Sequence, residues 1–149
     1  MNSAKRQLPE HPYTPAAQEA LRQLESMLSS WSAETSGENL LLVTQLRCDS
    51  TELRVWIGPE QITVAAAVMT VPGHPHVLTW ILTENLDQEF KAFATPSRHG
   101  QVPVSVMSSY PSSALPELGR LIWAGFGAAL TWRGRLWQVK VPNEPGTPG

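Results

Sequence analysis

Alternating apolar and polar positions dominate the sequence between residues 39 and 83 and predict β-strands in quick succession. Gly58-Pro59 and Pro72-Gly73 are turn signals between the apolar runs. The predicted strands cover residues 39–48, 52–57, 61–71 and 76–83. Connections this short join only antiparallel neighbours, because a parallel crossover needs about a dozen residues or more. We therefore expect an antiparallel meander of these strands.

The later strands of this meander carry apolar side chains on both faces. Within residues 61–71, Val64 and Val68 share one face while Ala65 and Met69 share the other. A strand that is covered on one side only shows a simple alternation of apolar and polar residues. Both faces near the middle of the sheet therefore need cover, which helices can provide on one side and a partner subunit on the other.

Apolar residues at spacings of three and four predict helices before and after the meander. A first helix is expected to begin at Thr14, with a loop following over residues 32–38. Its apolar stripe consists of Ala17, Leu21, Leu24, Leu28 and Trp31. About two heptads of this pattern also leave pairing with a second copy open. Further helices are expected at residues 86–94, capped by Asn85, and from about residue 115 to 126.

The remaining segments predict more strands. Val102, Val104 and Val106 alternate with other residues, and Pro103 places this strand at a sheet edge because proline cannot donate to the ladder. A C-terminal hairpin is expected from residues 129–132, a turn at 133–134 and residues 135–141. The prediction is a single α+β domain over residues 14–141, with helices on one sheet face, a flexible arm at 1–13 and a disordered tail at 142–149.

Composition modifies this picture in one respect. Charged residues make up only 16% of the chain and the net charge is −2, which argues against a protein that coats nucleic acid electrostatically. The acidic residues nevertheless concentrate before residue 98, whereas after it only Glu117 and Glu144 are acidic. The basic residues of that C-terminal part are Arg98, Arg120, Arg133, Arg135 and Lys140. A positive patch on an acidic body is therefore expected there.

This positive patch overlaps the densest aromatic cluster of the chain. On the predicted hairpin Trp137 would face the core, leaving Trp132, Arg133, Arg135 and Lys140 exposed. A purely structural role, a protein interface and a platform for stacked bases all fit these residues. Arg54 and Trp56, on the polar face of the second predicted strand, form another candidate binding site with the same alternatives.

Catalytic and metal-binding patterns are weak. His74 and His76 would share one side of an extended strand, but no recognisable spacing adds a third ligand. Cys48 reads as a small hydrophobe rather than a nucleophile. Neither a phosphate-binding glycine-rich loop nor a nucleophile elbow occurs. We expect no enzymatic activity, no cofactor and no metal.

Localisation and function follow from the same residues. The single cysteine, the lack of an apolar signal segment and the lack of a 20-residue apolar run predict a cytoplasmic protein without membrane contact. The main hypothesis is a non-catalytic protein-binding or adaptor domain, with a homodimer as one form of self-association. The alternative is a single-stranded nucleic-acid-binding accessory protein that uses the basic and aromatic C-terminal hairpin.

Overall fold

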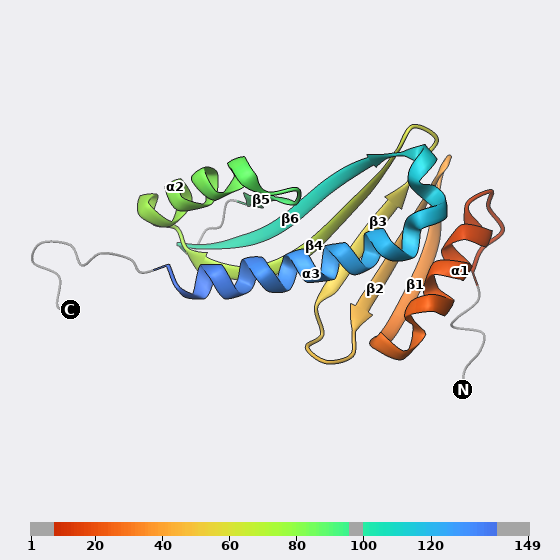
Figure 1. Cartoon of the computed structure of the whole chain (residues 1–149), viewed down its shortest axis with the longest axis horizontal. Coiled ribbons are helices and arrows are strands. Elements are labelled where there is room, and N and C mark those ends of the chain that lie inside the picture. Colours follow the sequence, from red (N-terminus) through yellow and green to blue (C-terminus); the bar gives the residue numbers. More distant parts are fainter. Residues whose placement is uncertain (1–7, 96–99, 140–149) are drawn as a thin grey trace, which may run out of the picture.

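The computed structural model describes residues 8–95 and 100–139 as an α+β fold (Figure 1). Its α-helices are α1 (Thr14–Leu24), α2 (Pro75–Glu84) and α3 (Leu118–Trp137). Short 3₁₀ turns are η2 (Glu25–Met27), η3 (Asn85–Asp87) and η4 (Ser112–Glu117). The strands are β1 (Leu28–Ser36), β2 (Asn39–Leu46), β3 (Glu52–Ile57), β4 (Gln61–Pro72), β5 (Lys91–Ala94) and β6 (Gln101–Pro111). Lys140 and the expected tail at 142–149 lie outside the described residues.

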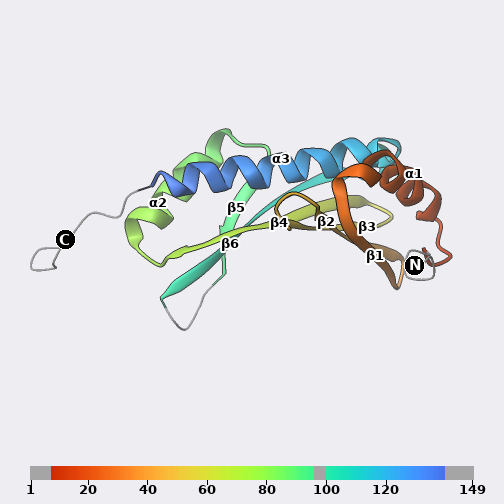
Figure 2. The same cartoon turned by 90° about the horizontal axis from the view of Figure 1, so that it is seen from below.

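The strands form one antiparallel sheet in the order β1-β2-β3-β4-β6-β5. Figure 2 shows the helices gathered on one side of this sheet and the other side bare. The predicted α+β class, with an antiparallel sheet and helices on one face, is confirmed. The strands predicted at 39–48, 52–57 and 61–71 correspond to β2, β3 and β4.

The hydrophobic core lies between the sheet and the helices α1 and α3. Leu53 and Val64 of the sheet face α3 at Gly125, where an added Cβ would lie 2.4 Å and 2.8 Å from their side chains. Gly119 allows a similar approach between α3 and α1, because an added Cβ there would meet Gln23 and the backbone of Ala20. Glycine at these two positions thus brings α3 close to both of its neighbours.

The first predicted helix is too long. α1 ends at Leu24, and the residues expected on its last turns, Leu28 and Trp31, belong to β1. Leu28 still faces the core, because it lies opposite Leu46 of β2 in the sheet. The predicted loop at 32–38 is also wrong, since β1 reaches Ser36 and turns at Gly37, whose φ is +60°. With only 11 residues, α1 does not carry the two-heptad stripe that left self-pairing open.

The predicted strand at 76–83 is wrong, because these residues form α2. Pro75 occupies the start of the helix, and the side chain of His74 accepts a hydrogen bond from the backbone N–H of His76. The buried residues of α2, Val77 and Ile81, are four apart, as a helix requires. A short run that is apolar in both phases fits a buried strand equally well, which explains the error.

The predicted helix at 86–94 is replaced by η3 and β5. Asn85 does not cap a helix there; its side chain instead donates to the carbonyl of Ala92 and accepts from the N–H of the same residue. These two bonds fix the turn that leads into β5. The strand itself pairs with β6 from Lys91↔Met107 to Ala94↔Val104.

The expected edge strand is longer than predicted and lies inside the sheet. β6 pairs with β4 on one side and with β5 on the other. Pro103 is accommodated because the β5 ladder ends one residue earlier, at the Ala94↔Val104 pair, and Thr95 N–H donates to the carbonyl of Pro103. The predicted edge position is therefore wrong, and the proline is tolerated because it lies where the β5 ladder has ended.

The C-terminal hairpin does not form. The helix expected from about residue 115 to 126 instead runs through the hairpin residues to Trp137. Ala129, Trp132 and Leu136 are buried at helical spacings of three and four. The predicted orientations of the two tryptophans are therefore reversed: Trp132 is 2% exposed and Trp137 is 73% exposed.

Candidate protein-binding surface

The sheet face that carries no helix is the broadest candidate surface. Side chains from five strands meet on it, because alternate residues of each strand point away from the helices. One row of paired residues runs from Leu41 through Trp56 to Thr63 and Ser109. We define the open sheet face by its apolar side chains Leu41, Val43, Trp56, Ala65, Ala67, Phe93 and Met107.

The three largest apolar side chains of the open sheet face are substantially exposed. Trp56 is 36%, Met107 41% and Phe93 42% exposed. Serine and threonine hydroxyls surround them, and the hydroxyl groups of Thr63 and Ser109 lie 3.3 Å apart across β4 and β6. The face also carries Glu34, Glu52, Arg54 and Lys91, so its exposed apolar side chains lie among hydroxyl groups and charges of both signs.

Arg54 and Trp56, predicted from sequence as a binding pair, both lie on this face. Arg54 stands between Val43 and Ala65 in the cross-strand row. Its guanidinium donates to the carboxylate of Glu52 at 3.0 Å, so the charge is balanced locally. The polar face predicted for β3 is therefore present, and its tryptophan adjoins apolar neighbours from other strands.

A shallow depression of about 580 Å³ lies beside Trp56 at one end of the sheet. Its lining combines the β1–β2 turn with the β3–β4 turn, which includes Gly58 and Pro59. Glu38 and Glu60 bring negative charge to it, and no basic side chain lines it. A partner that reaches from the apolar centre into this depression would meet an acidic border.

Of the predicted C-terminal site residues, Trp132 is buried, and Arg133 and Arg135 are bound to partners within the chain. The indole N–H of Trp132 donates to the carbonyl of Phe90 at 3.1 Å. Its ring meets Trp80 edge to face, with the centroids 6.0 Å apart at 86°. Trp132 was expected to remain exposed beside a turn, and this expectation is wrong because the residue faces the core from a helix.

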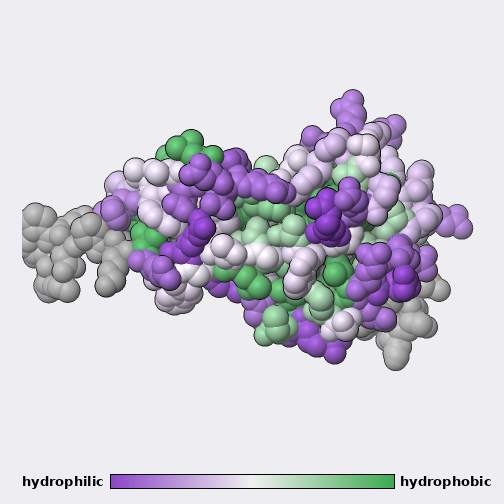
Figure 3. All heavy atoms as spheres, viewed as in Figure 1, coloured by the Kyte–Doolittle hydropathy of each residue, from purple (hydrophilic) through white to green (hydrophobic). Residues whose placement is uncertain are grey.

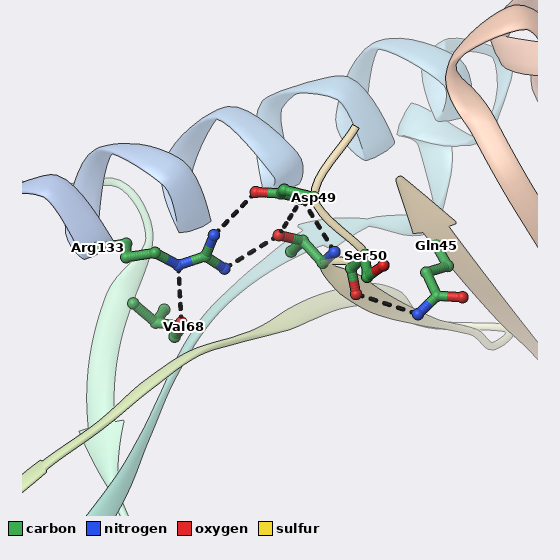
Figure 4. Close-up of polar contacts among 6 residues, drawn as sticks. Gln45, Asp49, Ser50, Val68 and Arg133 are labelled. Carbon is green, nitrogen blue, oxygen red and sulfur yellow. Dashed lines mark hydrogen bonds and ion pairs between the residues drawn. The ribbon is translucent and has the colours of Figure 1, made fainter. Parts of the chain in front are cut away.

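Arg133 joins α3 to two distant segments (Figure 4). Its Nε donates to the carbonyl of Val68, which lies in the register shift between β4 and β6. Its two terminal nitrogens donate to Asp49 at 2.8 Å and to Thr51 at 3.0 Å. Partial burial by itself raises the pKa of Asp49, but hydrogen bonds from Thr51 and Arg133 outweigh it and hold that pKa below its usual value.

Arg135 has a similar internal partner. Its guanidinium donates to Glu84 at the end of α2, at 2.6 Å. The structure thus brings Trp132, Arg133 and Arg135 together on one helix, but each makes contacts within the chain. Lys140 lies outside the described residues, and the expected basic patch at the C-terminus is not assembled by the residues that are described.

Groups for catalysis or metal binding do not gather in the described part of the chain. No set of three or more His, Cys, Asp or Glu side chains there is placed to hold a metal ion. His74 and His76 do not share a strand face, because they begin α2. Cys48 is exposed. Burial and a hydrogen bond to Glu89 raise the pKa of Tyr110 to about 12, so its phenol stays protonated at neutral pH.

Sequence reasoning missed two exposed apolar sites on the helices. Leu82 of α2 is 69% exposed and Leu86 of η3 79% exposed. On α3, Trp123, Leu130 and Trp137 are 55%, 41% and 73% exposed. Their spacing of seven residues was visible in the sequence, but it carries meaning only if residues 118–137 form one helix.

No helix among the described residues is both long and apolar enough to cross a membrane.

Comparison with known family models, curated proteins and solved structures found no match to this chain.

Proposed function

We propose that this chain is a non-catalytic protein-binding domain that engages its partner through the open sheet face. The observation that carries the proposal is a sheet face without helix cover on which Trp56, Phe93 and Met107 are exposed. Aromatic residues and methionine are enriched at protein interfaces, whereas charged residues are depleted at their centres. The open sheet face has the aromatic and methionine side chains, and the charge of its Arg54 is balanced by Glu52.

The surrounding structure supports recognition by a preformed surface. The apolar side chains stand on paired strands rather than on loops, so little backbone entropy is lost when a partner binds. The acidic depression beside Trp56 favours a partner that carries an apolar patch next to a basic group. A preformed apolar surface next to an acidic depression supports an adaptor function best.

The nucleic-acid alternative loses the feature that suggested it. It needed an exposed Trp132 for base stacking and unpaired arginines for phosphates. Trp132 is buried, and Arg133 and Arg135 are occupied by Asp49 and Glu84. We therefore do not extend that alternative into a proposal.

The proposal is tested by placing a photo-crosslinking amino acid at Met107 in cells that naturally make the protein. Irradiation is expected to give an adduct of defined mass, because Met107 lies among the apolar side chains that a partner would cover. Trp56→Glu in the same chain should abolish the adduct, since a buried unpaired carboxylate costs several kcal/mol. Trp56 is partly exposed, so this change should leave the fold intact.

The matched control carries the crosslinker at Thr83, an exposed residue of α2 outside the open sheet face. It is expected to give no adduct of that mass. Equal adducts from Met107 and Thr83, or a Met107 adduct that survives Trp56→Glu, would contradict the proposal. Circular dichroism of each variant shows whether the fold is retained.

A further inference from the structure

The outward face of α3 carries a regular pattern that the fold itself does not use. We define the outer stripe of α3 as Trp123, Gly127, Leu130, Gly134 and Trp137. The residues alternate at spacings of four and three, so they follow one seam along about 14 residues, or about 21 Å, of the helix. Figure 3, which looks onto the helix layer, shows hydrophobic surface across the middle of that layer.

The two glycines of the outer stripe have no role inside the chain. An added Cβ at Gly127 or Gly134 would meet nothing within 4 Å, in contrast to Gly119 and Gly125. Glycine within a helix costs about 1 kcal/mol relative to alanine. The outer stripe thus combines large apolar side chains that are only partly covered with glycine positions, or notches, that no side chain of the chain fills.

We propose that two copies of this chain form a two-fold symmetric dimer in which their α3 helices pack antiparallel through the outer stripe. In an antiparallel pair each notch position lies beside a large residue of the other helix. Trp123 then fills the notch at Gly134 of the second copy, and Leu130 fills the notch at Gly127. Two-fold symmetry repeats both contacts, which gives four filled layers.

A parallel pair would not fit. It would set glycine against glycine and tryptophan against tryptophan, so voids would alternate with overcrowded layers. In the antiparallel register the N-terminal end of one helix also meets the C-terminal end of the other, and their dipoles attract. Trp137 then reaches the Arg120 of the second copy, where a cation–π contact can form.

The charges along α3 permit this approach. Its basic residues are Arg120, Arg133 and Arg135, and each has an acidic partner in its own chain. Two copies of the helix therefore bring together no unpaired like charges. A tryptophan buries about 150 to 250 Å² when it is fully covered. Trp123 and Trp137 still expose 55% and 73% of their surface, so the four tryptophans of the dimer supply roughly half of the about 1,000 Å² that a specific interface needs.

The first test is the mass of the full chain in solution, measured by sedimentation at several concentrations. The unchanged protein is expected to be a dimer, and Leu130→Glu is expected to weaken dimerisation by at least about tenfold. Leu82→Glu serves as the matched control, because Leu82 is more exposed than Leu130 but lies on α2. A monomer at all concentrations, or a loss of the dimer only with Leu82→Glu, would overturn the proposal.

Filling the notches separates specific packing from general stickiness. Gly127→Leu and Gly134→Leu add hydrophobic surface and favour the helix, so each monomer should fold at least as well. The proposed pairing is nevertheless blocked, and both variants should dimerise more weakly than the unchanged chain. Equal or stronger association would overturn the proposal, because it would show that hydrophobicity alone drives it.

Disulfide trapping tests the register in a Cys48→Ser background. Mixed Trp123→Cys and Gly134→Cys chains should crosslink to each other, since these positions are opposed in the antiparallel pair. Gly134→Cys alone should crosslink poorly, because its two copies are then offset by about 11 residues, or about 16 Å, along the helix. Efficient crosslinking of Gly134→Cys to itself would indicate a parallel pair and would overturn the proposed arrangement. Sheet-face variants such as Trp56→Glu should remain dimeric, so this test is independent of the proposed protein-binding function.

Discussion

At the scale of single residues, the most informative group is the triangle of Arg133, Asp49 and Thr51. Arg133 satisfies the carbonyl of Val68, which lies where the β4–β6 register shifts. Asp49 in turn accepts from the hydroxyl and the backbone N–H of Thr51. The Arg133 side chain thus binds the sheet where its register shifts and also holds the β2–β3 turn. The charges of Arg133 and Asp49 are paired with each other, so they do not form a site for a partner.

This group makes the free energy of unfolding pH-dependent. The pKa of Asp49 is lower in the folded chain than its unfolded value of about 3.9, so the folded state binds fewer protons. The contribution of Asp49 is therefore present above about pH 4 and is lost as the pH falls through the folded pKa. Urea denaturation at about pH 7, 5, 4 and 3 should show this loss, and Asp49→Asn should show a shallower one.

Arg133→Ala should lower the free energy of unfolding at pH 7 by about 2 to 3 kcal/mol, because the Val68 carbonyl loses its side-chain donor and Asp49 loses its ion pair. Arg22→Ala is the matched control, since Arg22 pairs with Glu19 at the surface of α1 and should cost under about 1 kcal/mol. Equal effects of the two changes would contradict this role of Arg133.

At the scale of elements, α3 shows how neighbouring glycines differ in purpose. Gly125 lies against Leu53 and Val64, whereas Gly127 faces open space. Gly125→Ala is expected to destabilise the chain by about 1 to 3 kcal/mol through overpacking. Gly127→Ala should stabilise the monomer by about 1 kcal/mol. Thermal unfolding at a concentration that keeps the chain monomeric checks both, and changes of the same sign would contradict the packing described.

The strength of the local pattern decided which elements could be predicted from the sequence. Strands β2, β3 and β4 were predictable because their alternation is local and their turns carry Gly, Pro or Asp. The segments around α2, β5 and the end of α3 were not, because short apolar runs fit either period. As part of a helix, Trp132 contacts Phe90 and Trp80. These residues are distant in the sequence, so the pattern around Trp132 could not reveal the contacts.

The candidate site was predictable to a similar degree. Arg54 and Trp56 were identified because strict alternation in β3 shows which side chains leave the core. Phe93 and Met107 could not be added to them, since they join the open sheet face only through the pairing of β5 with β6. The binding site predicted at the C-terminal cluster was wrong, because aromatic and basic residues also make contacts inside a protein.

At the scale of the whole molecule, α3 holds two parts of the sheet together. Its beginning packs on α1, and its end is tied to α2, to Phe90 and to the β2–β3 turn (Figures 1 and 2). A chain that ends at Glu117 is expected to lose cooperative thermal unfolding and to bind a hydrophobic dye. A chain that ends at Val139 should unfold cooperatively in calorimetry, and similar behaviour of both chains would contradict this role.

The position of α3 also has a consequence for protein synthesis. The helix follows all the strands of the described residues, and Arg133 reaches back 84 residues to Asp49. During translation the part of the inner sheet face that α3 covers therefore stays exposed until almost 140 residues have been made. At about 5 to 20 residues per second, this interval lasts several seconds for β2 and β3. The nascent chain thus exposes a hydrophobic sheet face on which other chains can aggregate. Slow translation of α3 would lengthen the time for which this face is exposed.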